Sequence, residues 1–224
     1  MLTINYVLPE IFLALSAMIL LILGVFLKKG IKIVNILTII TLIFTTALII
    51  TQPDETIKVF NESYIIDKLS IVMKVLTLLF TVFVLLSSKE YLKINNIDKI
   101  EYQIIILLAA LGMLIMISSY DLIVFYLGLE LQSLCLYILA SFKKNDEKST
   151  EAGLKYFVLS SLATGLLLYG FSLIYGFTGS TNFAIIATNL DINNMGAVFA
   201  IVFVIVGLAF KVSLVPFHMW TPDV

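Results

Sequence analysis

The sequence is poor in the residues that bind metals, redox groups and nucleic acids. Among 224 residues there is one cysteine and one histidine, and all fourteen basic residues are lysine. Cys135 has no second cysteine with which to form a disulfide, and by itself it cannot hold zinc or a metal cluster, so we expect it to be a packing residue. The net charge of −1 provides no basic surface for nucleic acid.

Glycine-rich phosphate-binding loops are absent as well. The sequence contains neither a G-x-G-x-x-G pattern after a strand nor a P-loop. Together with the lack of a cysteine set, this predicts that the chain itself binds no NADH, flavin or iron–sulfur cluster.

Apolar residues, by contrast, dominate the chain. Hydrophobic residues make up 61% of it, and the mean hydropathy is +1.09. Both values are far above those of a soluble domain. A membrane-spanning helix needs about 20 apolar residues, and the sequence holds seven such runs. We therefore predict an all-α, polytopic transmembrane helix bundle that forms a single domain over residues 1–224. The expected helices are 11–27, 33–51, 67–88, 102–118, 122–142, 150–177, and a seventh from 195 to a break near Pro216.

Polar or charged loops and one longer connection are expected between these runs. Residues 52–64 are polar, 89–101 and 143–149 are charged, and 178–194 form a longer connection with a weakly apolar middle. Ser149 or Thr150 is expected to cap the sixth helix.

Lysines are distributed unequally between the two ends of the predicted helices. Nine lie in the connections after the first, third and fifth helices, and two lie on the other side. Cytoplasmic loops carry an excess of lysine, so these odd-numbered connections are predicted to lie inside. The N-terminus is then periplasmic, or on the intermembrane-space side in a mitochondrion. The nine are Lys28, Lys29, Lys32, Lys89, Lys93, Lys99, Lys143, Lys144 and Lys148, and the two are Lys58 and Lys68.

Four ionisable residues fall within predicted spans, namely Lys74, Glu130, Lys155 and Lys211. Each costs at least ~2.5–3.5 kcal/mol on insertion scales and therefore needs a partner or water. Glu130 lies near the centre of its run, and Gly128 allows another helix to approach closely. A functional carboxylate is favoured there over a protonated one that is hydrogen-bonded between helices. Lys74 is either a snorkelling lysine or a pathway residue.

The remaining charged positions have two interpretations each. Glu151 and Lys155 are four residues apart on one helix face, which predicts an interfacial ion pair or a functional pair. Lys211 lies before the expected proline break, which would free carbonyls near residues 212 and 213. It is either an ion-pathway residue near the negative end of a half-helix or a lysine that snorkels to the interface. His218 suits a proton relay, since its ordinary pKa is ~6.5, or is structural.

Three polar segments resemble one known family. The segment GLAFKVSLVPFHMWTPDV at 207–224 resembles the broken seventh helix of the antiporter-like membrane subunits of respiratory complex I. The segment YDLIVFYLGLELQSL at 120–134 resembles the fifth helix of that family, with Glu130 as its central glutamate. The segment STEAGLKYFVLSS at 149–161 resembles the sixth. Their order and spacing agree with the family over essentially the whole chain.

The resemblance implies a site and a function. It places Glu130, Lys211, Lys155, Glu151 and His218 on a central hydrophilic axis, along which proton movement is coupled electrostatically to quinone reduction elsewhere in the complex. It implies contact with the lipid bilayer and with other membrane subunits. NADH, FMN, iron–sulfur clusters and quinone would be bound by other subunits. The expected location is the bacterial inner membrane or the mitochondrial inner membrane.

The family also implies a second half. Its members have about fourteen helices in two inverted halves, and this sequence corresponds to the N-terminal half alone. We therefore expect a fragment, or a split or truncated gene product, that does not pump by itself. Two alternatives are a subunit of the related multisubunit cation/proton antiporters and a truncated scaffold without pumping activity.

Overall fold

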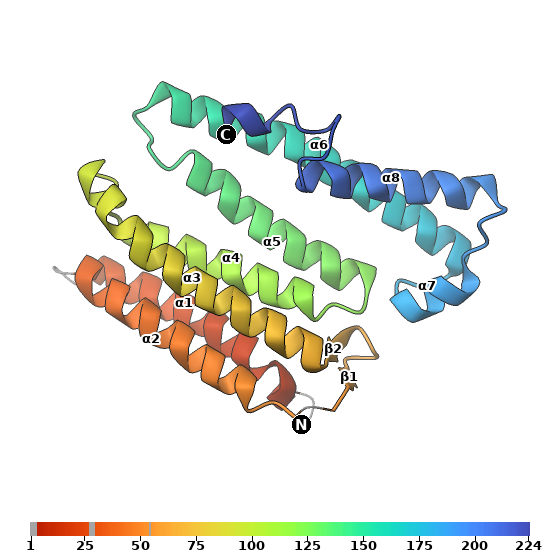
Figure 1. Ribbon diagram of the computed structural model, residues 1–224, viewed down its shortest axis with the longest axis horizontal. Coiled ribbons are helices and arrows are strands. Elements are labelled where there is room, and N and C mark those ends of the chain that lie inside the picture. The colour runs from red at the N-terminus through yellow and green to blue at the C-terminus, as the bar shows by residue number, and fades with distance from the viewer. Residues whose placement is uncertain (1–3, 27–29, 54) are drawn as a thin grey trace. The chain divides into compact units, whose positions relative to one another are not determined.

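The computed structural model describes residues 4–26, 30–53 and 55–224 (Figure 1). The chain divides into two compact units. The first comprises Met1–Ser119 with Leu127–Leu136, and the second comprises Tyr120–Tyr126 with Tyr137–Val224. The expectation of one transmembrane domain stays a prediction.

The first unit is built mainly of long apolar helices. A short 3-10 helix, η1 (Ile4–Val7), leads into α1 (Leu8–Phe26), which is followed by α2 (Gly30–Ile50), α3 (Lys68–Ile94) and α4 (Ile100–Ile117). The middle of α5 (Leu122–Ala140) completes it. Each of α1 to α4 contributes a leucine with 0% exposure to one shared core, so these four helices pack as a bundle. Those leucines are Leu13, Leu42, Leu78, Leu107 and Leu114.

A β-hairpin occupies much of the connection between α2 and α3. Strands β1 (Ile57–Val59) and β2 (Tyr64–Ile66) pair antiparallel. The stretch over residues 52–64 that we predicted as a polar loop therefore contains regular strand structure. The backbone amide of Ile65 donates to the carbonyl of Ser118 at the end of α4, at 2.8 Å. The hairpin thus satisfies backbone groups beside the apolar bundle, where an irregular loop would leave them unpaired.

Helix α3 is longer than the sequence predicted. It continues past residue 88 to Ile94, through the charged stretch that we expected to be a loop. Lys89 and Lys93 are exposed, so their ammonium groups reach water while the backbone stays helical. The helix ends where Asn96 adopts a left-handed φ of 56° and the amide of Ile97 donates to the carbonyl of Leu92.

The second unit contains α6 (Glu147–Thr178), α7 (Phe183–Asn189) and α8 (Met195–Lys211), with a 3-10 helix, η2 (Thr221–Asp223), near its end. Helices α6 and α8 lie side by side (Figure 1). Helix α7 lies in the longer connection over residues 178–194, at its weakly apolar middle. It forms because the Asn182 side chain accepts from the amide of Ala184 and because Ile186 is buried.

The N-terminus of α6 also differs from its prediction. Asp146 caps the helix by accepting from the amide of Lys148 at 3.0 Å, in place of Ser149 or Thr150. The Ser149 hydroxyl instead donates to the carbonyl of Ala140 at 2.8 Å. The helix therefore begins three residues before the predicted start at residue 150.

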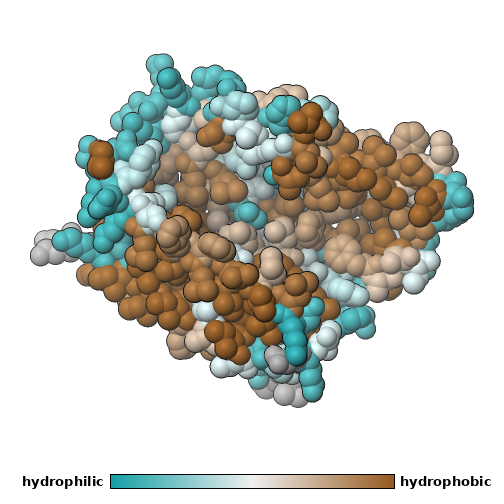
Figure 2. Space-filling view, viewed as in Figure 1, coloured by the Kyte–Doolittle hydropathy of each residue, from teal (hydrophilic) through white to brown (hydrophobic). Residues whose placement is uncertain are grey.

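The seven predicted spans are all helical. Within the described residues, six helices are long and apolar enough to cross a membrane, and α8 is a shorter apolar helix. The predicted end of the first helix at Leu27, with Lys28 and Lys29, lies outside the described residues, as does Asp54 of the second connection. Large apolar side chains cover broad areas of the visible face (Figure 2). Many large apolar residues are exposed, among them Ile36, Phe80 and Leu162 at 61–66%. Such a surface is suited to lipid, and the chain is an integral membrane protein.

Candidate functional site

Helix α8 ends at Lys211, before the proline that we expected to break it. Ser213 adopts a left-handed φ of 56°, its amide donates to the carbonyl of Phe210, and the amide of Leu214 donates to that of Ala209. This is a Schellman cap, which closes the helix through its own backbone bonds. The prediction that Pro216 itself sets the break was therefore wrong in position. The expected place of Lys211 at the C-terminal end of a helix is confirmed, since it is the last residue of α8.

The Lys211 side chain is directed at two buried hydroxyl groups. Its Nζ donates to the Tyr137 hydroxyl at 3.0 Å and to Ser160 Oγ at 2.9 Å. The Tyr137 hydroxyl in turn donates to Ser160 Oγ at 2.5 Å. Tyr137 is 4% exposed and Ser160 is 0% exposed, whereas Lys211 is half-buried. We call these three residues the Lys211 cluster.

The geometry of the Lys211 cluster suits the movement of a proton. An ammonium group can only donate hydrogen bonds, whereas a hydroxyl can accept one bond and donate another. The Lys211 Nζ also lies 5.6 Å from the centroid of the Tyr137 ring, where the face of the ring attracts a cation. The arrangement can therefore hold a protonated lysine inside the protein and connect it to further hydrogen-bonding groups.

Tyr137 and Ser160 were missed by the sequence analysis. The sequence holds one signal for Tyr137, because it follows Glu130 by seven residues, which is two turns of one helix face. Ser160 gives no such signal, since serine is common within transmembrane helices.

The segment after α8 returns to the first half of α6 (Figure 1). The Trp220 ring stacks on Tyr156 with centroids 4.4 Å apart, and its indole Nε1 donates to the carbonyl of Phe210 at 3.2 Å. These contacts hold the chain end against the helices that carry the Lys211 cluster.

Lys155 forms the ion pair predicted from its spacing. Its Nζ lies 2.8 Å from Glu151 Oε1 and also 2.8 Å from Asp223 Oδ2, a partner that the sequence did not indicate. The lysine side chain is 41% exposed, so this is a solvent-accessible group. His218 lies exposed in the segment that follows α8.

Glu130 lies half-buried on the part of α5 that belongs to the first unit. The predicted close approach at Gly128 is confirmed there: a Cβ on Gly128 would lie 2.8 Å from the carbonyl oxygen of Gly112 on α4. The two backbones meet only because both residues lack a side chain. Coupling between Glu130 and Lys211 stays a prediction.

A second buried polar cluster surrounds Lys74 in the first unit. The Lys74 Nζ donates to Glu10 Oε1 at 2.7 Å and to the Tyr64 hydroxyl at 2.9 Å, and that hydroxyl donates to Glu10 Oε1 at 2.7 Å. Lys74 is 0% exposed, which rules out a snorkelling lysine. Burial, with the nearby Glu10 charge, raises the pKa of Tyr64 well above its ordinary value, so its hydroxyl keeps its proton. We call Glu10, Tyr64 and Lys74 the Lys74 cluster.

Cys135 is buried with a free thiol, as expected for a packing residue. Among the described residues, no group of three or more histidine, cysteine, aspartate or glutamate side chains is placed to hold a metal ion.

The chain is similar to one family of membrane proteins. Residues 119–224 match the sequence pattern described as "NADH:quinone oxidoreductase/Mrp antiporter, TM". The chain is 57% identical to NADH-quinone oxidoreductase subunit N of Pelagibacter ubique, over 98% of this chain and 47% of that protein. It is 50% identical to the subunit N of Azorhizobium caulinodans, over 97% of this chain and 46% of that protein.

A solved structure agrees with these relatives. A chain of respiratory complex I from Thermus thermophilus with bound aureothin superposes with a TM-score of 0.77 at 31% identity, covering 96% of this chain and 46% of that one. The chain thus spans about half the length of the curated relatives that it matches.

Proposed function

We propose a proton-carrying function for this chain, which belongs to the NADH:quinone oxidoreductase/Mrp antiporter family of membrane subunits. In this proposal the chain contributes a proton half-channel to a complex that couples electron transfer from NADH to quinone to proton translocation. The whole relatives are about twice as long, so the complete path would include residues that correspond to their other half.

The observation that carries the proposal is the Lys211 cluster. A lysine at the end of an apolar helix directs its ammonium group at two buried hydroxyls, contributed by two other helices. Placing this charge within a membrane-spanning unit costs at least ~2.5–3.5 kcal/mol. Intramembrane ionisable residues that bear this cost typically mark an ion path.

The hydroxyls give the lysine a route for its proton. When a proton leaves the Lys211 Nζ for a hydroxyl oxygen, that hydroxyl releases its own hydrogen to the next acceptor, and the lysine becomes neutral. The Tyr137 hydroxyl already donates a hydrogen bond to Ser160 Oγ, as such a transfer from one hydroxyl to the next requires. The negative end of α8 favours the charged lysine, so reprotonation restores the starting state.

The other predicted residues take supporting roles. Glu130 would be a second proton-carrying group whose charge favours or disfavours protonation of Lys211. Lys155 with Glu151 and Asp223 would form an accessible charged entrance, and His218, which is exposed, would exchange protons with water there.

The wider setting follows from the family. The partners would be other membrane subunits of the complex, and NADH, FMN, iron–sulfur clusters and quinone would bind elsewhere in it. By the lysine distribution, the connections after α1, α3 and α5 would face the bacterial cytoplasm or the mitochondrial matrix, with the N-terminus on the opposite side.

The test replaces Lys211 by methionine in the full-length subunit within the assembled complex. Methionine has a similar length without a charge. Inside-out vesicles report NADH oxidation and proton uptake on the same sample. We expect proton uptake for each NADH oxidised to fall, whereas Lys144→Met, an exposed lysine before α6, leaves it unchanged.

Wild-type proton uptake by an assembled Lys211→Met complex would refute the proposal. Sodium-dependent proton movement without NADH oxidation would support the antiporter alternative instead. Loss of assembly in every variant of the cluster, with no separate effect on proton uptake, would support the scaffold.

A further inference from the structure

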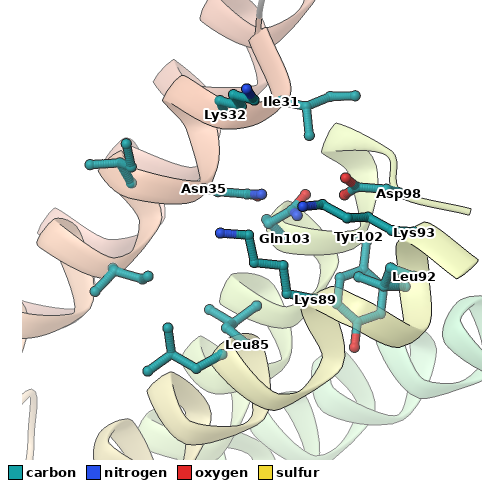
Figure 3. A pocket seen from close by; sticks show the side chains of 13 residues that line it. Ile31, Lys32, Asn35, Leu85, Lys89, Leu92, Lys93, Asp98, Tyr102 and Gln103 are labelled. Carbon is teal, nitrogen blue, oxygen red and sulfur yellow. The ribbon is translucent and has the colours of Figure 1, made fainter.

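A pocket of about 370 Å³ lies among α2, α3 and α4 of the first unit (Figure 3), and no residue of the Lys74 cluster or the Lys211 cluster lines it. Lys32 comes from α2, Lys89 and Lys93 come from the last turns of α3, and Asp98 follows α3. The pocket was not visible in the sequence, because we expected the chain to be an irregular loop from residue 89 onward. The helical continuation of α3 is what places Lys89 and Lys93 on its wall.

The charges around this pocket favour an anion. Three lysines and one carboxylate line it, which gives a net charge of +2. Figure 3 shows Lys89 and Lys93 extending from α3 toward α2, where the Asn35 amide lies. Ammonium and amide groups are donors that suit phosphate oxygens.

The rest of the pocket wall is apolar. Ile36 and Ile39 on α2 and Leu85 on α3 line it below the lysines, one to two turns further into their helices. Ile36 is 61% exposed, so this wall continues into the surface that suits lipid. A soluble anion would leave the apolar wall uncovered, whereas an acyl chain would cover it.

Asp98 indicates that the ligand carries a hydrogen-bond donor. Its Oδ1 is shielded from solvent, and none of the described residues donates a hydrogen bond to it. A buried carboxylate oxygen is stabilised by a donor. A ligand that meets every feature of the pocket therefore carries a phosphate, an acyl chain and a hydroxyl group.

We propose that this pocket binds an anionic phospholipid with a glycerol head group. The phosphate lies between Lys32, Lys89 and Lys93, a glycerol hydroxyl donates to Asp98, and an acyl chain follows Ile36 and Ile39. Basic pockets between transmembrane helices on the inner side of a membrane are suited to anionic head groups. The lysine distribution assigns this end of the helices to the inner side. The site shares no residue with the proposed proton path, and lipid binding can be measured without any activity assay.

The test uses the purified full-length subunit in detergent, titrated with phosphatidylglycerol and, separately, with phosphatidylcholine. Native mass spectrometry counts the lipids retained by each molecule. Each lysine near an anionic lipid contributes about five-fold in affinity, so Lys32→Gln, Lys89→Gln and Lys93→Gln together lower phosphatidylglycerol affinity roughly 100-fold. The matched control removes three lysines outside the pocket, Lys99, Lys144 and Lys148, and retains wild-type affinity.

Several outcomes would overturn the proposal. Equal losses of phosphatidylglycerol affinity in the pocket variant and the control variant would show a nonspecific effect of charge. Equal retention of phosphatidylcholine would remove the requirement for an anion, and displacement by inorganic phosphate alone would identify a soluble ligand. If the triple variant is unfolded, Lys89→Gln alone still tests the site, with an expected loss of about five-fold.

Discussion

Replacing Lys74 by methionine should destabilise the chain more than replacing Lys74 and Glu10 together. Lys74 and Glu10 are 0% and 3% exposed, and their charged atoms lie 2.7 Å apart. Two unit charges at that distance attract by about 6 kcal/mol at an effective dielectric constant of about 20. Removing both ions from water costs several kcal/mol for each, so the intact pair contributes little net stability.

A single replacement leaves the other charge buried without its counter-ion. Lys74→Met or Glu10→Leu alone should therefore lower the free energy of unfolding by ~3–5 kcal/mol. The double variant removes both charges, and its remaining cost of roughly 1–3 kcal/mol arises because the Tyr64 hydroxyl loses its partners. The coupling energy between the two positions should thus be about 3 kcal/mol or more.

Equilibrium unfolding in mixed micelles, followed by circular dichroism, measures the free energy of unfolding of the wild type, the two single variants and the double variant. Lys58 and Glu62 provide a matched control, because they form a 3.0 Å pair on the surface with side chains 34% and 59% exposed. That pair should couple by no more than ~1 kcal/mol. A coupling energy as small for Glu10 and Lys74 would refute the argument that burial decides the effect.

Two further predictions concern helix contacts. Gly128→Ala should lower the free energy of unfolding by about 1–3 kcal/mol, because the new methyl group would meet backbone atoms of α4 at 2.8 Å. A Cβ on Gly165 would have no neighbouring atom within 4 Å, so Gly165→Ala should leave the free energy of unfolding unchanged or raise it in the same assay. Equal effects at the two glycines would contradict the steric account. Asp146→Ala should lower the thermal unfolding temperature at pH 7, because Asp146 caps α6. The hydrogen bond from Lys143 holds the pKa of Asp146 below its ordinary value, so the stabilising effect is present above the unfolded pKa of ~3.9 and is lost as pH falls below that value. A difference between wild type and variant that grew on acidification would contradict this sign.

Features set by local composition could be predicted from the sequence. Hydropathy located all seven predicted helices, because a membrane-spanning run of apolar residues has few alternatives to helix. The Glu151–Lys155 pair followed from helix geometry alone, and the close approach at Gly128 followed from the absence of a side chain.

Features set by contacts between distant residues could not be predicted in this way. Glu10 and Lys74 are 64 residues apart, and Lys211 is 74 residues from Tyr137, so spacing carries no sign of either contact. The end of α8 was misplaced because a proline is visible in the sequence, whereas a serine that adopts the left-handed conformation is not. The extension of α3 was missed because exposed lysines are compatible with either a helix or a loop.

The central claim is that the two hydroxyls of the Lys211 cluster carry its proton. The most direct test measures protons translocated for each NADH oxidised in an assembled complex carrying Tyr137→Phe and Ser160→Ala, with Lys211 intact. The account predicts that this ratio falls to the level of Lys211→Met, because the lysine has lost the groups that accept its proton. A wild-type ratio in the assembled double variant would contradict it.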